Sequence, residues 1–274
     1  MLNLERALGL LERARKGEVL LGMHCSTMSP QAVELGGLCG VDYCIIGMES
    51  ESLDPSVCEN ILRAAEVSGQ VTMIKVRRPR AELVEDALTA GANFVTVPHI
   101  TSAAMLHEMM TAARFAGSGG QRGCCAIARY IAYGTMQMDK AFQACRTYNP
   151  IIPIIEDKEA LDNLDEILDV DEGRSGIIEI GPFDLSMSLG IANPQGYNNK
   201  EVMEAIYLIY SKAKERGKAL LAPVWYPPNS TPEQSAKFMH ERLVSRGINL
   251  IYDGDLFLMR RVLGQMNLLK TTKL

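Results

Sequence analysis

The sequence predicts an α/β protein that folds as a closed (β/α)₈ barrel. Short apolar runs rich in β-branched residues recur along the 274-residue chain, and stretches with helical periodicity separate them. Alternation of this kind indicates a parallel sheet, and about eight such units in about 250 residues are typical of this barrel. An open doubly wound sheet is the alternative, but no GxGxxG fingerprint follows the first strand.

Each expected element has its own local signal. Ser29 before Pro30 is typical of a helix start, and Gly91 stops a helix. The expected strands cover residues 19–25, 42–47, 71–76, 94–98, 151–156, 176–181, 219–225 and 249–255. The expected helices are an amphipathic N-terminal one and those starting at Ser29 and covering 54–68, 81–90, 102–114, 159–168, 200–216, 232–246 and 256–269. With no linker in sight, residues 1–274 are predicted to form one domain.

One segment, residues 116–149, breaks this rhythm and predicts a loop inserted after the fourth strand, with a short helix of its own. Long insertions in compact domains are usually functional loops or lids. Arg122 lies in it, within Gln121-Arg122-Gly123. We expect Arg122 either to close over a substrate or to brace the inserted loop.

Composition excludes several classes of protein. The net charge is −5 without a basic stripe, which argues against nucleic acid as a partner. No apolar run reaches the ~18 residues of a membrane span, and the N-terminus lacks the pattern of a signal peptide. The seven cysteines include no CxxC pair, so we expect reduced thiols and a cytoplasmic location.

Two consecutive strands end in an acid, Glu156 after the fifth and Asp184 just after the sixth. Asp and Glu are almost never fully buried unless they are paired or bind a metal. The pair therefore predicts a site for a hard cation. The alternative is that each acid starts the helix that follows.

In such a barrel the reactive groups gather at the carboxyl ends of the strands. The residues delivered there combine carboxylates, cations and imidazoles, as a site for a small anionic substrate requires. They are His24 or Cys25, Glu49 with Ser50, Lys75 with Arg77, His99, Glu156, Asp184, Trp225, and Asp253 with Asp255.

Several of these stretches resemble a known family. Ile180-Gly-Pro-Phe-Asp-Leu-Ser, Ile155-Glu-Asp-Lys-Glu-Ala-Leu, Met48-Glu-Ser-Glu-Ser-Leu-Asp-Pro and Gln121-Arg-Gly occur in the order seen in the HpcH/HpaI aldolase/citrate lyase family of the phosphoenolpyruvate/pyruvate barrel superfamily. The resemblance spans roughly residues 18 to 265. It implies a class II, metal-dependent aldolase that cleaves or forms 4-hydroxy-2-oxo acids through a metal-stabilised pyruvate enolate.

The resemblance also implies roles for individual residues. Glu156 and Asp184 hold the metal, Mg²⁺ or Mn²⁺ with Co²⁺ or Zn²⁺ as alternatives. Gly181, Pro182 and Phe183 bind the substrate, whose carboxylate lies against their backbone.

The chain departs from the family in the groups that move protons. The family pattern Asp-x-Glu-His reads Gly47-Met48-Glu49-Ser50 here, the family Arg falls on Lys75, and a family Gln falls on Ile154. A serine hydroxyl is not a base near neutral pH without an activating partner. The proton could instead be moved by a metal-bound water, or by one of two strand-end histidines, His24 and His99.

Other roles stay open. Lys75 assists as a cation, forms a Schiff base, or is a solvated side chain. Glu49 contacts metal-bound water or forms a surface ion pair. Trp225 lines the pocket or packs in the core.

The main functional hypothesis is a carbon–carbon lyase acting on a small 2-oxo acid. Because decarboxylation generates an enolate without proton abstraction, an oxaloacetate-type decarboxylase is an alternative. A metal-binding or 2-oxo-acid-binding barrel without aldol activity is another, and a barrel without metal a third. The resemblance implies a homo-oligomer, a hexamer or trimer, in which the helix at residues 256–269 packs on a neighbouring subunit; closing its own barrel is the alternative.

Overall fold

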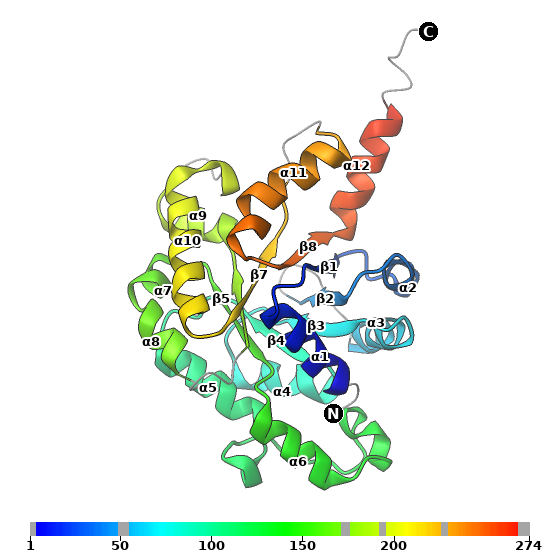
Figure 1. Ribbon diagram of the computed structural model, residues 1–274. Coiled ribbons are helices and arrows are strands. Elements are labelled where there is room, and N and C mark those ends of the chain that lie inside the picture. The colour runs from blue at the N-terminus through cyan, green and yellow to red at the C-terminus, as the bar shows by residue number, and fades with distance from the viewer. Residues whose placement is uncertain (1–3, 49–54, 171–175, 192–195, 226–229, 268–274) are drawn as a thin grey trace.

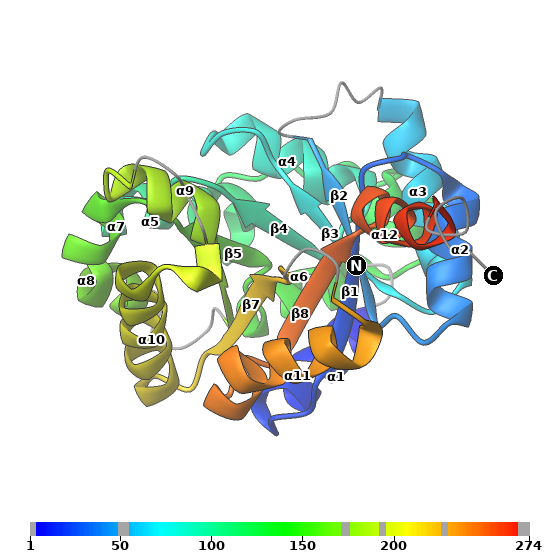
Figure 2. The same cartoon turned by 90° about the horizontal axis from the view of Figure 1, so that it is seen from above.

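The computed structural model describes residues 4–48, 55–170, 176–191, 196–225 and 230–267. Its eight strands are parallel and close into a barrel in the order of the sequence, which confirms the predicted fold (Figures 1 and 2). The strands are β1 (Leu20–Cys25), β2 (Tyr43–Gly47), β3 (Val71–Lys75), β4 (Phe94–Val97), β5 (Ile151–Ile155), β6 (Ile177–Ile180), β7 (Ala219–Pro223) and β8 (Leu250–Gly254).

The α-helices lie around the barrel and at its two ends (Figure 2). They are α1 (Leu4–Arg15), α2 (Pro30–Leu38), α3 (Pro55–Val67), α4 (Ala81–Ala90), α5 (Ala103–Ala113), α6 (Met138–Thr147), α7 (Lys158–Asp162), α8 (Leu164–Asp169), α9 (Pro182–Ser188), α10 (Lys200–Glu215), α11 (Pro232–Arg242) and α12 (Asp255–Asn267). Short 3₁₀ segments are η1 (Ala116–Ser118), η2 (Arg129–Gly134), η3 (Gly196–Asn198) and η4 (Val244–Arg246). The predicted cap is present: the Ser29 hydroxyl accepts the Ala32 N–H at the start of α2.

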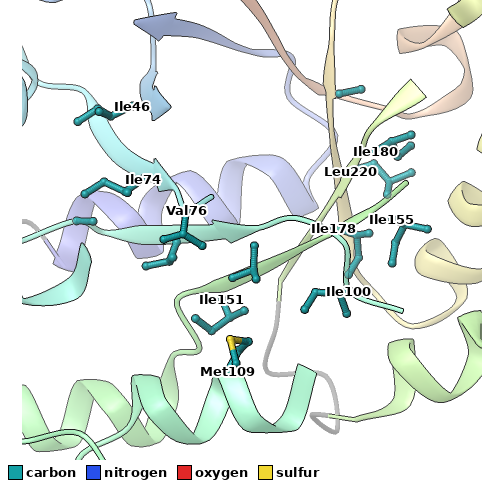
Figure 3. Close-up of a cluster of buried hydrophobic side chains, with 14 of the residues drawn as sticks. Ile46, Ile74, Val76, Ile100, Met109, Ile151, Ile155, Ile178, Ile180 and Leu220 are labelled. Atoms are coloured by element: carbon teal, nitrogen blue, oxygen red, sulfur yellow. The ribbon is translucent and has the colours of Figure 1, made fainter. Parts of the chain in front are cut away.

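Two apolar cores hold the strands, one on each face of the sheet. Because strand side chains alternate between faces, every second residue packs outward against the helices. Figure 3 shows part of this outer core, where Ile151 of β5 lies next to Met109 of α5 and Ile155 of β5 lies near Ile178 of β6. The inner core fills the lower part of the barrel with Leu20, Tyr43, Ile45, Val71, Met73, Phe94, Ile152, Ile177, Leu221 and Leu250.

Helix α1 closes the amino-terminal end of the barrel. Its buried Leu10 and Leu11 join the inner core. The chain is anchored there by Asn249, whose side-chain amide donates to the carbonyls of Ala14 (2.7 Å) and Glu18 (2.8 Å). The open end of the barrel is therefore the carboxyl end of the strands.

The inserted segment is present, but it lies at the end of the barrel away from that opening. It joins the end of α5 to the start of β5, and in Figure 1 α6 lies far from α12. Arg129 fastens it by donating to Glu66 (2.7 Å) at the end of α3 and to the Ala90 carbonyl (3.0 Å) at the end of α4. The expectation of a lid over the site is wrong for this chain, because the segment leaves the barrel at the amino ends of the strands.

The predicted helix at residues 159–168 is two helices. Asn163 interrupts it with φ −102° and ψ 14°, and its side chain donates to the Thr101 carbonyl (2.9 Å). A short polar side chain that bonds outside its own helix competes with helical geometry. Helix α9, directly after β6, was not predicted as a separate element.

Candidate active site at the carboxyl end of the barrel

Glu156 immediately follows β5 and is the most deeply buried acid at the open end, with 1% of its surface exposed. Its Oε1 accepts the backbone N–H of His99 at 2.9 Å. His99 has φ +54°, a left-handed conformation that is uncommon for residues other than glycine. The chain after β4 therefore holds an unfavourable backbone geometry that turns this N–H toward the carboxylate.

The second oxygen of Glu156 lies over Gly181, the residue after β6. A Cβ placed on Gly181 would lie 2.2 Å from Oε2, so only glycine fits here. None of the residues that the structure describes donates a hydrogen bond to this oxygen. The Glu156 carboxylate is thus anchored through one oxygen and presents the other toward Gly181.

Burial raises the pKa of Glu156 to about 7. The charge of Lys75, the His99 N–H and the His99 ring act in the opposite direction, while Asp184 adds to the rise. The protein therefore leaves much of the desolvation of this carboxylate uncompensated. A cation bound beside Glu156 would supply the missing compensation.

Asp184 lies in the first turn of α9 and is exposed. It is close enough to Glu156 and His99 for its charge to act on both. Neither acid is a helix N-cap: Asp157 precedes α7, and Gly181 precedes α9. Glu156 therefore does not start a helix, whereas Asp184 does lie in the first turn of α9, where an acid is favourable.

Lys75 and His99 accompany these acids. Lys75 ends β3 and is half-buried, and its charge acts on Glu156. The His99 ring donates from Nδ1 to Asp157 Oδ2 at 3.0 Å, with Glu156 Oε1 3.6 Å away. Burial alone would lower the pKa of His99, but the bond to Asp157 and the three carboxylates Glu156, Asp157 and Asp184 raise it.

The donor set fits a hard divalent cation. Glu156 and Asp184 offer carboxylate oxygens, the ligands that Mg²⁺ and Mn²⁺ prefer. Within the described ranges, no three His, Cys, Asp or Glu side chains surround a common point. Mg²⁺ commonly takes only one or two protein carboxylates and completes its shell with water and substrate oxygens. The unanchored Glu156 oxygen is suited to that arrangement.

The other predicted site residues are distributed around the opening. His24, half-buried on β1, has Nδ1 3.0 Å from the Ser26 hydroxyl. Trp225 packs against the outer core, with its ring 6.1 Å from that of Phe238. Pro182 is buried and Phe183 is exposed in the first turn of α9.

Arg122, predicted to bind the substrate, lies elsewhere. The Arg122 guanidinium is buried in the inserted segment, 4.8 Å from the Phe115 ring centroid and 4.3 Å from that of Tyr130. It braces that segment at the opposite end of the barrel, so the structure does not bring it together with Glu156. Glu49 and Ser50 lie outside the described residues.

Asp255, named from the sequence as a strand-end acid, fixes the loop after β1. It accepts the backbone N–H groups of Ser26 (3.0 Å) and Thr27 (3.1 Å) and the Thr27 hydroxyl. A carboxylate with these three donors is a structural clamp.

Sequence reasoning missed three polar residues at or below the opening. Asp157 holds His99. Glu179, in the middle of β6, accepts a hydrogen bond from the Tyr252 hydroxyl of β8 at 2.9 Å. The signal for Glu179 was an acid inside the apolar run Ile177-Ile178-Glu179-Ile180.

The HpcH/HpaI aldolase/citrate lyase family matches residues 21–249 of the chain. The chain belongs to this family. It is similar to the 2-keto-3-deoxy-L-rhamnonate aldolase of Escherichia coli (strain K12), with 29% identity over 211 residues, 76% of each protein. The expected aldolase-type lyase family is thereby confirmed.

Several solved structures share the fold. A HpcH/HpaI aldolase/citrate lyase family protein from Burkholderia cenocepacia J2315 superposes with a TM-score of 0.82 at 23% identity, covering 96% of this chain and 99% of that one. The CitE protein of Mycobacterium tuberculosis, solved with magnesium and pyruvate, superposes with a TM-score of 0.55 at 13% identity, covering 86% and 85%. At these identities the likeness concerns the fold. No helix within the described parts of the chain is long and apolar enough to cross a bilayer.

Proposed function

We propose that this family member is a divalent-metal-dependent carbon–carbon lyase acting on a small 2-oxo acid, with a 4-hydroxy-2-oxo acid as the substrate it cleaves and a pyruvate-type enolate as the intermediate. The observation that carries the proposal is the state of Glu156. It is buried, anchored through one oxygen only, and placed beside Asp184 at the open end of the barrel.

Glu156 and Asp184 are the residues that would hold the cation, Mg²⁺ or Mn²⁺ in preference to Co²⁺ or Zn²⁺. A divalent cation bound there supplies Lewis acidity that polarises the keto group of the substrate. Lys75 adds positive charge on the β3 side, where it favours the enolate over the neutral keto acid. Gly181 and Pro182, with Phe183 at the edge, form the wall beside which a substrate carboxylate would lie.

The names of two similar proteins support this substrate class. The Escherichia coli relative is named for an aldol reaction of a 2-keto acid, and the Mycobacterium tuberculosis protein was solved with magnesium and pyruvate. A pyruvate-like moiety beside a divalent cation is the chemistry that we carry over to this chain.

A second candidate is decarboxylation of an oxaloacetate-type acid. The described residues at the opening favour it, because Lys75 is a cation and the three nearby carboxylates raise the pKa of His99. Such groups stabilise negative charge better than they remove a proton. Loss of CO₂ produces the enolate without proton removal.

We also propose a homo-oligomer, a hexamer or trimer, in which α12 packs on a neighbouring copy. Helix α12 projects from the barrel in Figure 1. Its exposed apolar residues, each between 41% and 64% exposed, are Leu256, Phe257, Leu258, Met259, Val262, Leu263 and Met266. Exposed apolar surface of this extent is typical of interaction sites. A cytoplasmic location remains a prediction, supported by the free thiols of Cys25, Cys44 and Cys58.

The test is to incubate the protein with Mn²⁺ or Mg²⁺ and either pyruvate in D₂O or oxaloacetate. We expect exchange of the pyruvate methyl protons by NMR and release of CO₂ from oxaloacetate. Decarboxylation alone favours the second candidate. Metal binding without either reaction means a binding barrel, and no metal uptake by calorimetry overturns the proposal. A borohydride-trapped pyruvate adduct on Lys75 would replace it with Schiff-base chemistry.

A further inference from the structure

A polar pair, Glu179 and Tyr252, lies inside the barrel below the Glu156 site. Glu179 is 1% exposed, and its Oε1 accepts the Tyr252 hydroxyl at 2.9 Å. Barrel interiors are normally filled by layers of branched apolar side chains, and a buried acid there has to be paired. The pair is therefore a departure from simple packing that needs a reason.

Further buried hydroxyl groups lie inside the barrel. The Tyr43 ring lies over Gly22 of the neighbouring strand, where a Cβ would lie 2.1 Å from the ring. Burial, reinforced by the charge of Glu179, raises the pKa of both Tyr43 and Tyr252, so both phenols stay protonated at neutral pH. The hydroxyls of Tyr43 and Thr96 are buried, and among the described residues neither has a hydrogen-bond partner. Buried hydroxyl groups in this state are uncommon in folded proteins.

Two glycines lie between this pair and the open end of the barrel. The next inward-facing positions on the two strands are Gly181 above Glu179 and Gly254 above Tyr252. Glu156 Oε2 reaches over Gly181, and two residues of strand span about 7 Å. Tyr252 is itself partly exposed, and its ring lies 6.3 Å from that of His24. The phenol thus lies one layer below the predicted metal acid, with no side chain of its own strand above it.

A group that accepts a proton from a substrate in this site needs a partner to which it can pass its own proton. Tyr252 has such a partner, because its hydroxyl donates to the Glu179 carboxylate. The His99 ring is already engaged through Nδ1 with Asp157 at 3.0 Å.

We propose that Tyr252 is the catalytic proton carrier of this site and that Glu179 is the positioning residue that acts through it. This inference rests on the proposed lyase function. When pyruvate is deprotonated, the C3 proton passes to the Tyr252 oxygen while the Tyr252 proton passes to Glu179 Oε1. The C3–H electron pair forms the C2–C3 double bond, and the carbonyl pair moves to the enolate oxygen. In aldol cleavage the same pair takes the proton of the 4-hydroxyl and returns it to C3 after the C3–C4 bond breaks.

The experiment compares two reactions of the metal-loaded enzyme. Tyr252→Phe should slow pyruvate C3 exchange in D₂O by about 10²-fold or more, the usual contribution of a general acid–base. Oxaloacetate decarboxylation should stay near the wild-type rate, because it forms the enolate without removing a proton. Glu179→Gln should slow exchange through kcat, with little change in KM. Mn²⁺ affinity by calorimetry and the melting temperature of the metal-free protein should match the wild type for Tyr252→Phe.

Tyr133→Phe, at a 59% exposed tyrosine of the inserted segment, is the matched control and should retain the wild-type exchange, whereas His24→Gln tests the rival proton carrier on the neighbouring strand. Exchange that survives Tyr252→Phe, or that His24→Gln abolishes instead, overturns the inference and leaves the lyase function standing. Equal losses of exchange and decarboxylation in Tyr252→Phe mean a structural role and also overturn it. If Tyr252→Phe does not fold, Glu179→Gln gives the same comparison. A wild-type protein that catalyses neither reaction overturns the proposed function and this inference with it.

Discussion

The two ends of the barrel interior differ in what fills them. At the amino-terminal end, Leu10 and Leu11 of α1 pack onto Leu20 and Ile177 in a closed apolar floor. At the carboxyl end, glycine replaces side chains, and a buried carboxylate is held with a pKa of about 7. The floor lowers the free energy of the fold. The open end contains a charge whose burial opposes folding and a strained His99 backbone.

The residues that stabilise the fold and the residues of the proposed active site therefore lie at opposite ends of the barrel axis. Changes at the open end should affect metal and substrate while leaving the fold intact or more stable. Changes at the floor should do the reverse. Four predictions test that division, from the largest expected effect to the smallest.

The largest effect is expected for Glu156→Gln. Removing one of the two proposed metal ligands should lower kcat/KM for oxaloacetate decarboxylation by about 10³-fold or more, about 4 kcal/mol of transition-state stabilisation. Mn²⁺ affinity by calorimetry should fall with it. Glu159→Gln, exposed in α7, is the control and should leave both values unchanged. Wild-type Mn²⁺ uptake by Glu156→Gln would refute the assignment of the site.

At the floor, Leu11→Ala should lower the free energy of unfolding by about 2–5 kcal/mol, because it leaves a cavity under the inner core. Chemical denaturation measures this. Mn²⁺ affinity should not change. Leu8→Ala on the same helix is the control: Leu8 is 40% exposed, and its removal should change stability by less than about 0.5 kcal/mol. A loss of metal binding in Leu11→Ala would show that the two ends are coupled.

The raised pKa of Glu156 predicts a pH dependence of the metal-free protein. Folding raises this pKa from 4.5 to about 7, so the folded state binds the proton more tightly than the unfolded state. The stability that this carboxyl contributes is fully present below pH 4.5 and is lost as the pH rises to about 7, a change of about 3 kcal/mol. In EDTA, the unfolding free energy of the wild type should therefore fall between pH 5 and pH 8 by about 3 kcal/mol more than that of Glu156→Gln. Parallel pH profiles of the two proteins would contradict this prediction.

Much of the barrel could be predicted from the sequence because its strands are continuous β-branched runs, which only a buried parallel sheet accommodates. Ile151 to Ile155 and Ile177 to Ile180 are examples. The predicted order of helix 102–114, inserted segment and strand 151–156 already implies that the segment lies at the amino ends of the strands. The sequence could not show what fastens it there, because Arg129 acts through Glu66 and Ala90, which are distant in the chain. The break at Asn163 depends on one tertiary hydrogen bond and was equally out of reach.

The sequence likewise identified some residues of the candidate site but not how they interact. Glu156 and Asp184 could be named because an acid at the end of an apolar strand is conspicuous. The roles of their neighbours could not, since they depend on distances across strands: the His99 N–H reaches Glu156, Asp157 holds the His99 ring, and Asp255 became a loop clamp. Glu179 was passed over because periodicity alone does not reveal which face of β6 the acid occupies.

The smallest effect on the fold is expected for Phe183→Ala. Phe183 is 39% exposed at the start of α9, so its removal should change the unfolding free energy by less than about 0.5 kcal/mol. If it walls the substrate, KM for oxaloacetate should rise while kcat changes little, since binding is lost equally from ground state and transition state. Met187→Ala, 61% exposed one turn further along α9, is the control and should leave KM unchanged. If the two variants have equal KM values, Phe183 does not contact the substrate. The boundary of the site then lies at the buried Pro182, because only side chains that contact the substrate weaken its binding when they are truncated.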